Sequence, residues 1–253
     1  MGVDSGTVTV TALTHRGAVR QVNEDALVMG ALTVAGGSMN APARCLLPVQ
    51  EPLVLAVADG LGGHAAGEIA SEHAVHRMAE SGPQLIGPDA MTTLLTHIDD
   101  EIREHSVQNE EFSGMGTTVA GLLLTEEGIY WFNVGDSRTY RIRDLRLEQL
   151  SEDDSPPTVP GEDGRPTSTN FITQSLGGSS STPMQPHVGQ DREATAEGWL
   201  MCSDGLSDLV SNEEMEQILA AAVSDEAAVR ELWQAAMKVS GRDNISILLA
   251  RPY

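Results

Sequence analysis

The chain has 253 residues, a length that fits one domain or at most two small ones. Its 37 Asp and Glu against 15 Lys and Arg give a formal charge of −22, which disfavours nucleic acid as a partner because a phosphate backbone would be repelled. Hydrophobic residues make up 40% of the chain, enough for a sizeable core.

The two cysteines, Cys45 and Cys202, show neither metal-site spacing nor a disulfide framework, which fits a reducing cytosol. Residues 1–10 contain no basic stretch followed by an apolar run, and no segment approaches the roughly 18 consecutive apolar residues of a membrane span. We therefore expect a cytoplasmic protein with no signal peptide and no membrane insertion.

The first half of the chain predicts strands followed by two helices. Thr7 to Thr14 alternates Thr with apolar residues, as a half-buried strand does. Leu53 to Ala58 is a continuous apolar run that stops at an Asp-Gly pair, which indicates a buried strand ending in a turn. We expect a helix over His64 to Glu80 and an amphipathic helix over Pro88 to Val107. The apolar stripe of the second helix is Met91, Leu94, Leu95, Ile98 and Ile102.

The middle of the chain predicts consecutive strands and then loops. The expected strands are Thr117 to Leu124, Ile129 to Val134 and Arg138 to Ile142, with Leu145 to Leu150 as a fourth. Ser151 to Asn170 is rich in Pro, Ser, Thr, Asp and Gly, which predicts a surface loop or flap, and Gly178 to Gln190 predicts a second loop.

The last quarter predicts a strand, two helices and a final strand. The expected strands are Trp199 to Ser203 and Ile245 to Ala250. A helix that begins with a capping box of Ser211 and Glu214 should run through Val223, and a second should cover Asp225 to Val239. Because strands and helices come in groups, the order favours packed antiparallel sheets covered by helices over a doubly wound parallel sheet.

Carboxylates recur at the ends of the predicted strands. Asp59, Asp136 and Asp204 each follow a strand and adjoin a Gly, Asp243 precedes the last strand, and Glu24-Asp25 follows a turn. Converging carboxylates repel one another, and hard divalent cations such as Mg²⁺ and Mn²⁺, which prefer oxygen ligands, remove that cost. Taken singly, an Asp-Gly pair is a simple turn, so the interpretation depends on the combination.

Seven short motifs stand along the chain. They are RQVNED at 20–25, DGLGGH at 59–64 continuing to Ser71, GMGTT at 114–118, VGDSR at 134–138, TQSLG at 173–177, CSDGLSD at 202–208 and GRDNIS at 241–246. In this order they resemble the motifs of the metal-dependent protein phosphatase (PPM, or type 2C) family, particularly its bacterial Ser/Thr phosphatases. The resemblance covers the chain from about residue 14 to 250.

The resemblance implies an α+β fold, a four-layer α-β-β-α sandwich of two antiparallel β-sheets flanked by helix pairs. It implies a single phosphatase domain over 1–253, with the flap at about 151–170. It also implies two Mn²⁺ or Mg²⁺ ions per site, with positions for a third, in the cleft between the sheets.

The resemblance also implies a role for each site residue. Asp59 would bridge both metals and Gly60 would offer its carbonyl to the first. The second metal and its waters would take Glu24, Asp204 and Asp243, with Asp25 supporting the water network. Asp136 and Asp208 match third-metal positions, and Arg20 matches the arginine that clamps the substrate phosphate.

Some of these residues have alternative roles. Asp136 and Asp208 could instead hold turns, and Arg20 could be a plain surface arginine. His64 stands three positions after Leu61, the place where some family members carry a His that acts as general acid. It could act as an acid, orient the loop or cap the following helix.

Other polar residues near the motifs have smaller expected roles. Thr117 and Thr118 should pack or hydrogen-bond under the site, and Cys202 should be a buried structural residue because no covalent intermediate is needed. Asp154 stands where the family usually has His. The remaining histidines, His187 among them, have no chemical context, so solvent or packing roles are expected.

The leading hypothesis is hydrolysis of phosphoserine and phosphothreonine in proteins by a metal-bridging water, with an in-line attack that no covalent phosphoenzyme precedes. The expected partners are phosphorylated proteins, a bacterial Ser/Thr kinase and its substrates, and the chain is expected to be a monomer. The alternatives are a catalytically silent phosphoprotein-binding module of the same fold and an acidic cation-binding protein. The last lacks support, because no single loop has an EF-hand pattern.

Overall fold

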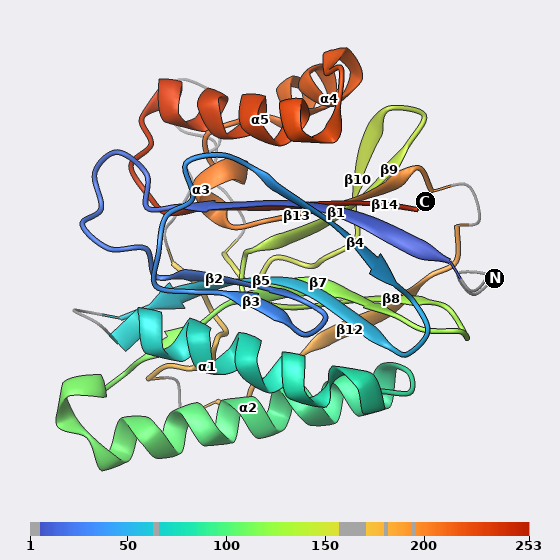
Figure 1. The fold of residues 1–253 in the computed structure, drawn as a ribbon. Coiled ribbons are helices and arrows are strands. Elements are labelled where there is room, and N and C mark those ends of the chain that lie inside the picture. The colour runs from blue at the N-terminus through green and yellow to red at the C-terminus, as the bar shows by residue number, and fades with distance from the viewer. Residues whose placement is uncertain (1–5, 63–65, 157–170, 180–181, 194–195, 253) are drawn as a thin grey trace.

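The computed structural model describes residues 6–62, 66–156, 171–179, 182–193 and 196–252, and their elements form four layers (Figure 1). In the described residues, one sheet has six strands in the order β10-β9-β13-β14-β1-β4. The other has eight, in the order β11-β6-β5-β7-β8-β12, with β2 pairing with β5 and β3 pairing with β2. The pairings are antiparallel in both sheets.

The strands of the six-stranded sheet come from both ends and the middle of the chain. They are β1 (Thr7–His15), β4 (Ala43–Pro48), β9 (Arg138–Arg143), β10 (Arg146–Gln149), β13 (Gly198–Cys202) and β14 (Ile245–Pro252). The eight-stranded sheet contains β2 (Asp25–Met29), β3 (Leu32–Val34), β5 (Leu53–Leu61), β6 (Gly116–Thr117), β7 (Val119–Leu124), β8 (Ile129–Val134), β11 (Leu176–Gly177) and β12 (His187–Asp191).

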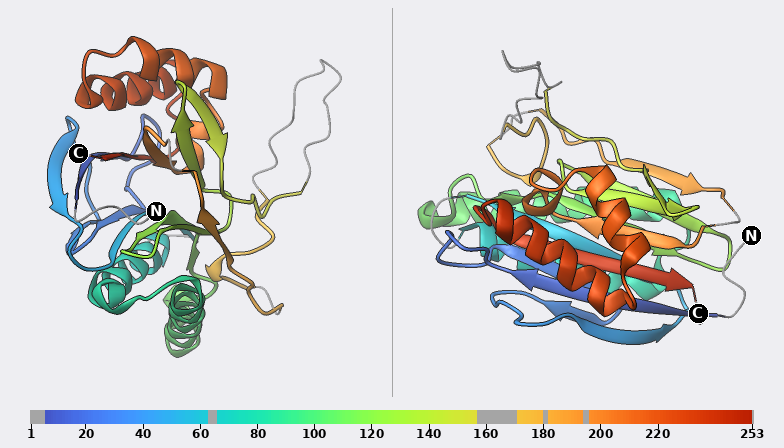
Figure 2. Two further views of the ribbon diagram at one scale, coloured as in Figure 1. Left: turned by 90° about the vertical axis from the view of Figure 1, so that its right-hand side faces the viewer. Right: turned by 90° about the horizontal axis from the view of Figure 1, so that it is seen from above.

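Helices cover the outer face of each sheet. Beneath the eight-stranded sheet in Figure 1 lie α1 (Ala66–Ser81) and α2 (Pro88–Gln108), and above the six-stranded sheet lie α4 (Asn212–Ala221) and α5 (Asp225–Val239). Figure 2 shows the second pair from above, crossing β14. The short helix α3 (Asp204–Ser207) follows β13, and two single 3₁₀ turns cover Gly82–Gln84 and Glu110–Phe112.

Three apolar clusters fill the spaces between these layers, and strand alternation explains how. In β5, Leu55 and Val57 point into the cluster between the two sheets, whereas Ala56 and Ala58 point into the cluster under α1 and α2. Side chains of successive strand residues point to opposite faces, so a strand buried on both sides is apolar at every position. The third cluster packs the six-stranded sheet against α4 and α5. The predicted four-layer α-β-β-α fold is therefore confirmed.

The predicted helices are confirmed with small shifts of their ends. The buried stripe of α2 includes all five predicted apolar residues. The Ser211 side chain caps α4 by accepting a hydrogen bond from the Glu214 backbone N–H. The helix predicted from residue 64 is described from Ala66 onward. The number of domains stays a prediction, and most of the predicted flap, 157–170, lies outside the described residues.

Two expectations about strands are wrong. The strand predicted to stop before Asp59 continues to Leu61, because β2 and β6 pair with its last residues. The loop predicted over Gly178 to Gln190 contains β12, which pairs with β8 at the sheet edge although its sequence is largely polar. Strands β2, β3 and β4 were not predicted.

No helix in the described part of the chain has the length and apolar character of a membrane span.

Candidate active site

A small acidic cavity of about 140 Å³ lies where segments of both sheets meet. Its walls come from the loop before β2, the end of β5, the turn between β8 and β9, the start of α3 and the loop before β14. The lining residues are Arg20, Glu24, Asp59, Gly60, Leu61, Asp136, Ile172, Asp204, Asp243 and Asn244.

Asp59 is the central carboxylate of this cavity. It lies in β5 directly opposite Asp25 of β2. The backbone N–H of Thr118 donates to the Asp59 carbonyl oxygen at 2.8 Å, and the Thr117 hydroxyl donates to the same oxygen at 2.9 Å. Burial raises the pKa of Asp59 well above its usual range, and the nearby charges of Asp25 and Asp204 raise it further.

Asp25 lies behind the cavity and is fully buried. The Ser203 hydroxyl donates to its Oδ2 at 2.9 Å, whereas its Oδ1 has no hydrogen-bond partner among the residues that the structure describes. Burial raises the pKa of Asp25 to about 7, although the hydrogen bonds from Ser246 and Ser203 oppose that change.

Asp204 and Asp136 line the cavity from the six-stranded side and from the β8–β9 turn. Burial, and then the charge of Asp136, raises the pKa of Asp204 to about 8. Burial, and then the charge of Asp208, raises the pKa of Asp136 to about 6. The Asp136 Oδ1 is buried and finds no hydrogen-bond partner in the described part of the chain. Asp208 itself does not line the cavity and pairs with Arg242 at 3.2 Å.

Arg20 is the cation at the rim of the cavity. Its Nη2 donates to Asp243 Oδ2 at 2.8 Å, and its Nη1 lies 3.9 Å from Glu24 Oε2. The hydrogen bond to Asp243 raises the pKa of Arg20, and burial raises the pKa of Glu24. The Arg20 side chain remains 47% exposed, so it can reach a ligand that approaches from solvent.

Asn244 joins the two loops that carry these charges. Its Oδ1 accepts the Glu24 backbone N–H at 2.8 Å, and its Nδ2 donates to the carbonyl oxygens of Arg16 and Val22. Its own backbone N–H donates to Asp243 Oδ1 at 2.9 Å. Asn244 thereby fixes the first and last motifs against each other.

Glycine is required where backbones approach closely around the cavity. A Cβ added at Gly60 would lie 2.3 Å from the carbonyl oxygen of Gly67 and 2.5 Å from that of Glu24. A Cβ at Gly205 would lie 1.8 Å from the Asn244 carbonyl oxygen. Any side chain at either position would therefore push apart the segments that carry the acidic residues.

The donor set suits a hard divalent cation. The candidate ligands are oxygen atoms, their burial and mutual repulsion oppose ionisation, and two buried carboxylate oxygens, on Asp25 and Asp136, have no partner. Within the described residues, however, no three His, Cys, Asp or Glu side chains stand in a ready-made metal geometry. Bringing them closer would require a cation, because without one they repel.

The structure places most of the predicted site residues together. Arg20, Glu24, Asp59, Gly60, Asp136, Asp204 and Asp243 line the cavity, Asp25 supports it from behind, and Asp208 lies outside it. His64 lies outside the described residues.

Sequence reasoning missed four further residues. Leu61 and Ile172 line the cavity, and Asn244 and Ser203 orient its carboxylates. The positions of Asn244 and Ser203 beside motif aspartates were the available signal. The expectation of a solvent or packing role for His187 is wrong, because its Nε2 lies 2.9 Å from Asp154 Oδ1.

The chain is similar to relatives of known function along most of its length. The family model "Protein phosphatase 2C" matches residues 47–248. The serine/threonine phosphatase stp of Listeria monocytogenes is 32% identical over 216 residues, which is 79% of this chain and 84% of that protein. The serine/threonine protein phosphatase PstP of Mycobacterium tuberculosis is 30% identical over 250 residues, which is 94% of this chain but 44% of PstP.

Solved structures agree with these matches. The crystal structure of the Mycobacterium tuberculosis phosphatase PstP/Ppp superposes with a TM-score of 0.74 at 25% identity, covering 97% of this chain and 98% of that one. The structure of Stp1 from Staphylococcus aureus gives a TM-score of 0.77 at 26% identity, covering 96% and 94%. By its match to the family model and its identity to these phosphatases, the chain belongs to the protein phosphatase 2C family.

Proposed function

We propose that this chain hydrolyses phosphoserine and phosphothreonine in proteins, with divalent cations held in the acidic cavity. The observation that carries this proposal is the cavity itself, where four aspartates and a glutamate face one another with Arg20 at the rim. Relatives named as Ser/Thr phosphatases support the reaction class.

The cations would be Mn²⁺ or Mg²⁺, two per site, with Asp136 and Asp208 available for a third. Asp59, Glu24, Asp204 and Asp243, with the Gly60 carbonyl, would hold the pair. When bound, such ions neutralise phosphoryl oxygens and lower the pKa of a water that can attack the phosphate. Asp25 would support the water network from behind the cavity, because its Oδ1 has no hydrogen-bond partner among the described residues and can accept one.

Arg20 would bind the substrate phosphate. In the structure one of its guanidinium nitrogens donates a hydrogen bond to Asp243 at 2.8 Å, and the side chain is half exposed. A guanidinium can hold two phosphoryl oxygens at once, and charge that builds on them in the transition state strengthens that contact. Arg20 would therefore orient the phosphate over the carboxylates.

Neighbouring residues would keep this arrangement rigid. Asn244 orients Glu24 and Asp243, Ser203 orients Asp25, and the Thr117 and Thr118 contacts fix the Asp59 backbone. Because such partners orient the side chains that hold a cation, their loss typically costs 10–100-fold in affinity or activity, an order-of-magnitude figure. The catalytic role predicted for His64 stays a prediction.

The natural substrates would be phosphorylated proteins, and the reaction would oppose a bacterial Ser/Thr kinase. The bacterial relatives support this assignment. A monomer acting in the cytoplasm fits the acidic surface charge and the two free cysteines. The competing function is a catalytically silent module of the same fold that binds phosphoproteins.

Phosphate release from a phosphothreonine peptide with Mn²⁺ tests the proposal. We expect turnover by the wild type that is lost in Asp204→Asn and in EDTA. A wild type that binds Mn²⁺ and peptide but releases no phosphate would exclude the phosphatase and establish the binding module.

A further inference from the structure

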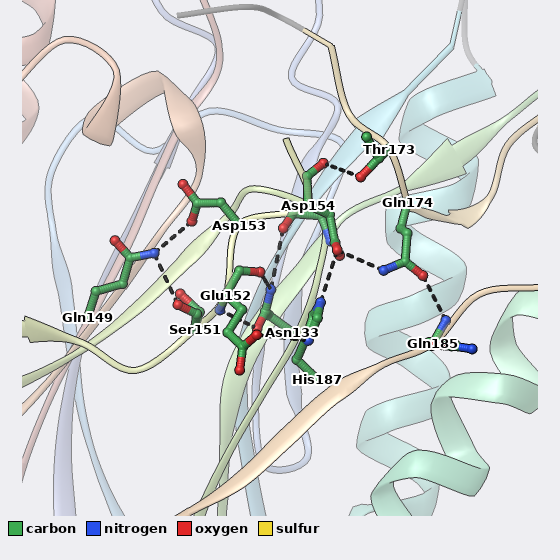
Figure 3. A network of polar contacts seen from close by, with 11 residues as sticks. Asn133, Gln149, Ser151, Glu152, Asp153, Asp154, Thr173, Gln174, Gln185 and His187 are labelled. Carbon is green, nitrogen blue, oxygen red and sulfur yellow. Dashed lines mark hydrogen bonds and ion pairs between the residues drawn. The ribbon is translucent and has the colours of Figure 1, made fainter. Parts of the chain in front are cut away.

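A second buried carboxylate, Asp154, lies beside the acidic cavity but does not line it. It follows β10 and is 7% exposed. Its Oδ2 accepts the Gly135 backbone N–H at 2.9 Å, and its Oδ1 accepts Gln174 Nε2 at 2.7 Å and faces His187 Nε2 at 2.9 Å (Figure 3). Three separate segments therefore converge on one side chain.

The contacts require a carboxylate at this position. The Gly135 N–H and the Gln174 amide are donors, and His187 can donate from Nε2 while its Nδ1 lies 3.6 Å from Glu152. An asparagine would set its NH₂ group against at least one of these donors. A group that remains buried without a partner costs about 1–3 kcal/mol.

One of the three segments is the turn that carries Asp136. Asp154 holds it twice, because its side chain accepts from Gly135 N and its backbone N–H donates to the Gly135 carbonyl at 3.0 Å. Gly135 has φ of 100°, and a Cβ there would lie 2.7 Å from the Thr118 side chain, so the turn has little freedom. The Asn133 Nδ2 also donates a hydrogen bond to the Gly135 carbonyl oxygen at 3.3 Å.

Another segment carries Ile172, which lines the cavity. The Asp154 carbonyl accepts the Thr173 backbone N–H at 2.7 Å and the Thr173 hydroxyl at 3.0 Å. Gln174, held by the Asp154 carboxylate, accepts the Gln185 backbone N–H at 2.8 Å. Asp136 and Ile172, which both line the cavity, are therefore each next in sequence to a residue that Asp154 contacts.

We propose that Asp154 is a positioning residue for the acidic cavity: held by His187 and Gln174, it fixes both the turn that bears Asp136 and the segment that bears Ile172. Because Asp154 does not line the cavity, it would touch neither the cations nor the phosphate. Through Asp136 it sets the affinity for the cation, and through Ile172 it sets the fit of the substrate. This inference rests on the proposed function.

Asp154→Asn is the variant that tests it. We expect KM for a phosphothreonine peptide to rise about tenfold and the Mn²⁺ concentration for half-maximal rate to rise about fivefold, in the range typical of residues that orient metal ligands. The kcat for p-nitrophenyl phosphate at saturating Mn²⁺ should stay within about threefold, because a small ester does not depend on the Ile172 wall.

Two further changes separate positioning from folding. Gln174→Ala removes a bond that ties the Ile172 segment to the Asp154 carboxylate. We expect it to raise the peptide KM, and to raise the Mn²⁺ requirement less than Asp154→Asn does, because His187 still holds Asp154. His187→Gln keeps a donor toward Asp154 and should behave as the wild type, whereas His187→Ala should show the Asp154→Asn effects in weaker form.

Asp191→Asn is the matched control. Asp191 is 8% exposed, lies at the opposite end of β12 from His187, and accepts hydrogen bonds from Trp199 and Glu193. It should lower the melting temperature without changing KM or the Mn²⁺ requirement. If Asp154→Asn and Asp191→Asn change all three quantities equally, Asp154 only stabilises the fold and the proposal is wrong.

Calorimetric titration with Mn²⁺ separates this proposal from the proposed function. If the wild type releases no phosphate, the phosphatase assignment fails, yet Asp154→Asn should still bind Mn²⁺ about fivefold more weakly than Asp191→Asn does. Equal Mn²⁺ affinity in these two variants would overturn the link from Asp154 to Asp136.

Discussion

Buried carboxylates of two kinds occur in this chain. Asp154 and Asp191, described above, and Asp99 of α2 accept hydrogen bonds from donors around them. The Asp99 carboxylate accepts hydrogen bonds from the Gly177 backbone N–H at 2.6 Å and from Arg103 Nε at 2.9 Å. By contrast, Asp136 in the acidic cavity and Asp25 behind it each have a buried oxygen with no hydrogen-bond partner among the described residues.

The difference indicates what each kind is for. A carboxylate surrounded by donors is stable in its charged form and ties segments together. A carboxylate surrounded by carboxylates is stable only when protonated or bound to a cation, because burial and repulsion both oppose its charge. Under the proposed function this repulsion gives the cavity an affinity for cations, whereas Asp99, Asp154 and Asp191 already have donors as partners.

The largest effect should follow from Asp204→Asn. If Asp204 holds a cation as proposed, the substitution removes a ligand and a repelling charge together, so we expect kcat/KM with Mn²⁺ to fall about a thousandfold, or about 4 kcal/mol. The metal-free variant should unfold at the same temperature as the wild type or at a higher one. Steady-state kinetics with Mn²⁺ measure the first effect, and thermal unfolding in EDTA measures the second. A metal-free variant clearly less stable than the wild type would contradict the distinction between the two kinds of buried carboxylate.

For Asp191→Asn, in contrast to Asp204→Asn, we expect a loss of stability. Here the substitution breaks buried bonds to Arg141 and Trp199, so the free energy of unfolding should drop by about 2–4 kcal/mol. Urea denaturation measures this change. Unaltered stability would mean that donors around a buried carboxylate contribute little in this fold.

The pH dependence of stability should identify Asp204 as a buried carboxylate surrounded by other carboxylates. Asp204 has a folded pKa raised to about 8, whereas its unfolded value is about 4. Such a group contributes stability below about pH 4 that is lost as the pH rises through the folded pKa. The metal-free stability advantage of Asp204→Asn over the wild type should therefore grow from about pH 5 to about pH 8. Melting temperatures in EDTA across this range check the sign, and an advantage that shrinks with pH contradicts it.

The smallest effect is expected at the rim. Arg20→Lys keeps the charge but loses the planar fork, so we expect kcat/KM to fall about tenfold, mostly through KM. Mn²⁺ affinity should hardly change, because Arg20 competes for Asp243 but holds no cation. Steady-state kinetics at saturating Mn²⁺ test this, and a fall confined to kcat would argue against a role in phosphate binding.

Much of the fold and of the site could be predicted from sequence. Alternating and continuous apolar runs located β1, β5 and β7, and Asp59, Asp204 and Asp243 were predicted from their places beside strands and glycines. That they gather in one cavity came from the resemblance, since the order of motifs along a chain does not by itself give their positions in space.

What could not be predicted depends on pairing between distant segments. β12 reads as a polar loop, because an edge strand is exposed on one side and needs few apolar residues. Asp25 could be suspected from its motif, but its position opposite Asp59 follows from the β2–β5 register. Asp154 stood out only as a departure from the family pattern, and its partner His187 lies 33 residues away.

A calorimetric titration of the metal-free protein with Mn²⁺ at about pH 7.5 tests the central claim most directly. The account predicts saturable binding by the wild type and by Asp191→Asn, with protons released as cations replace them on the carboxylates, and much weaker binding by Asp204→Asn. Binding that is absent from the wild type, or equally strong in Asp204→Asn, would contradict it.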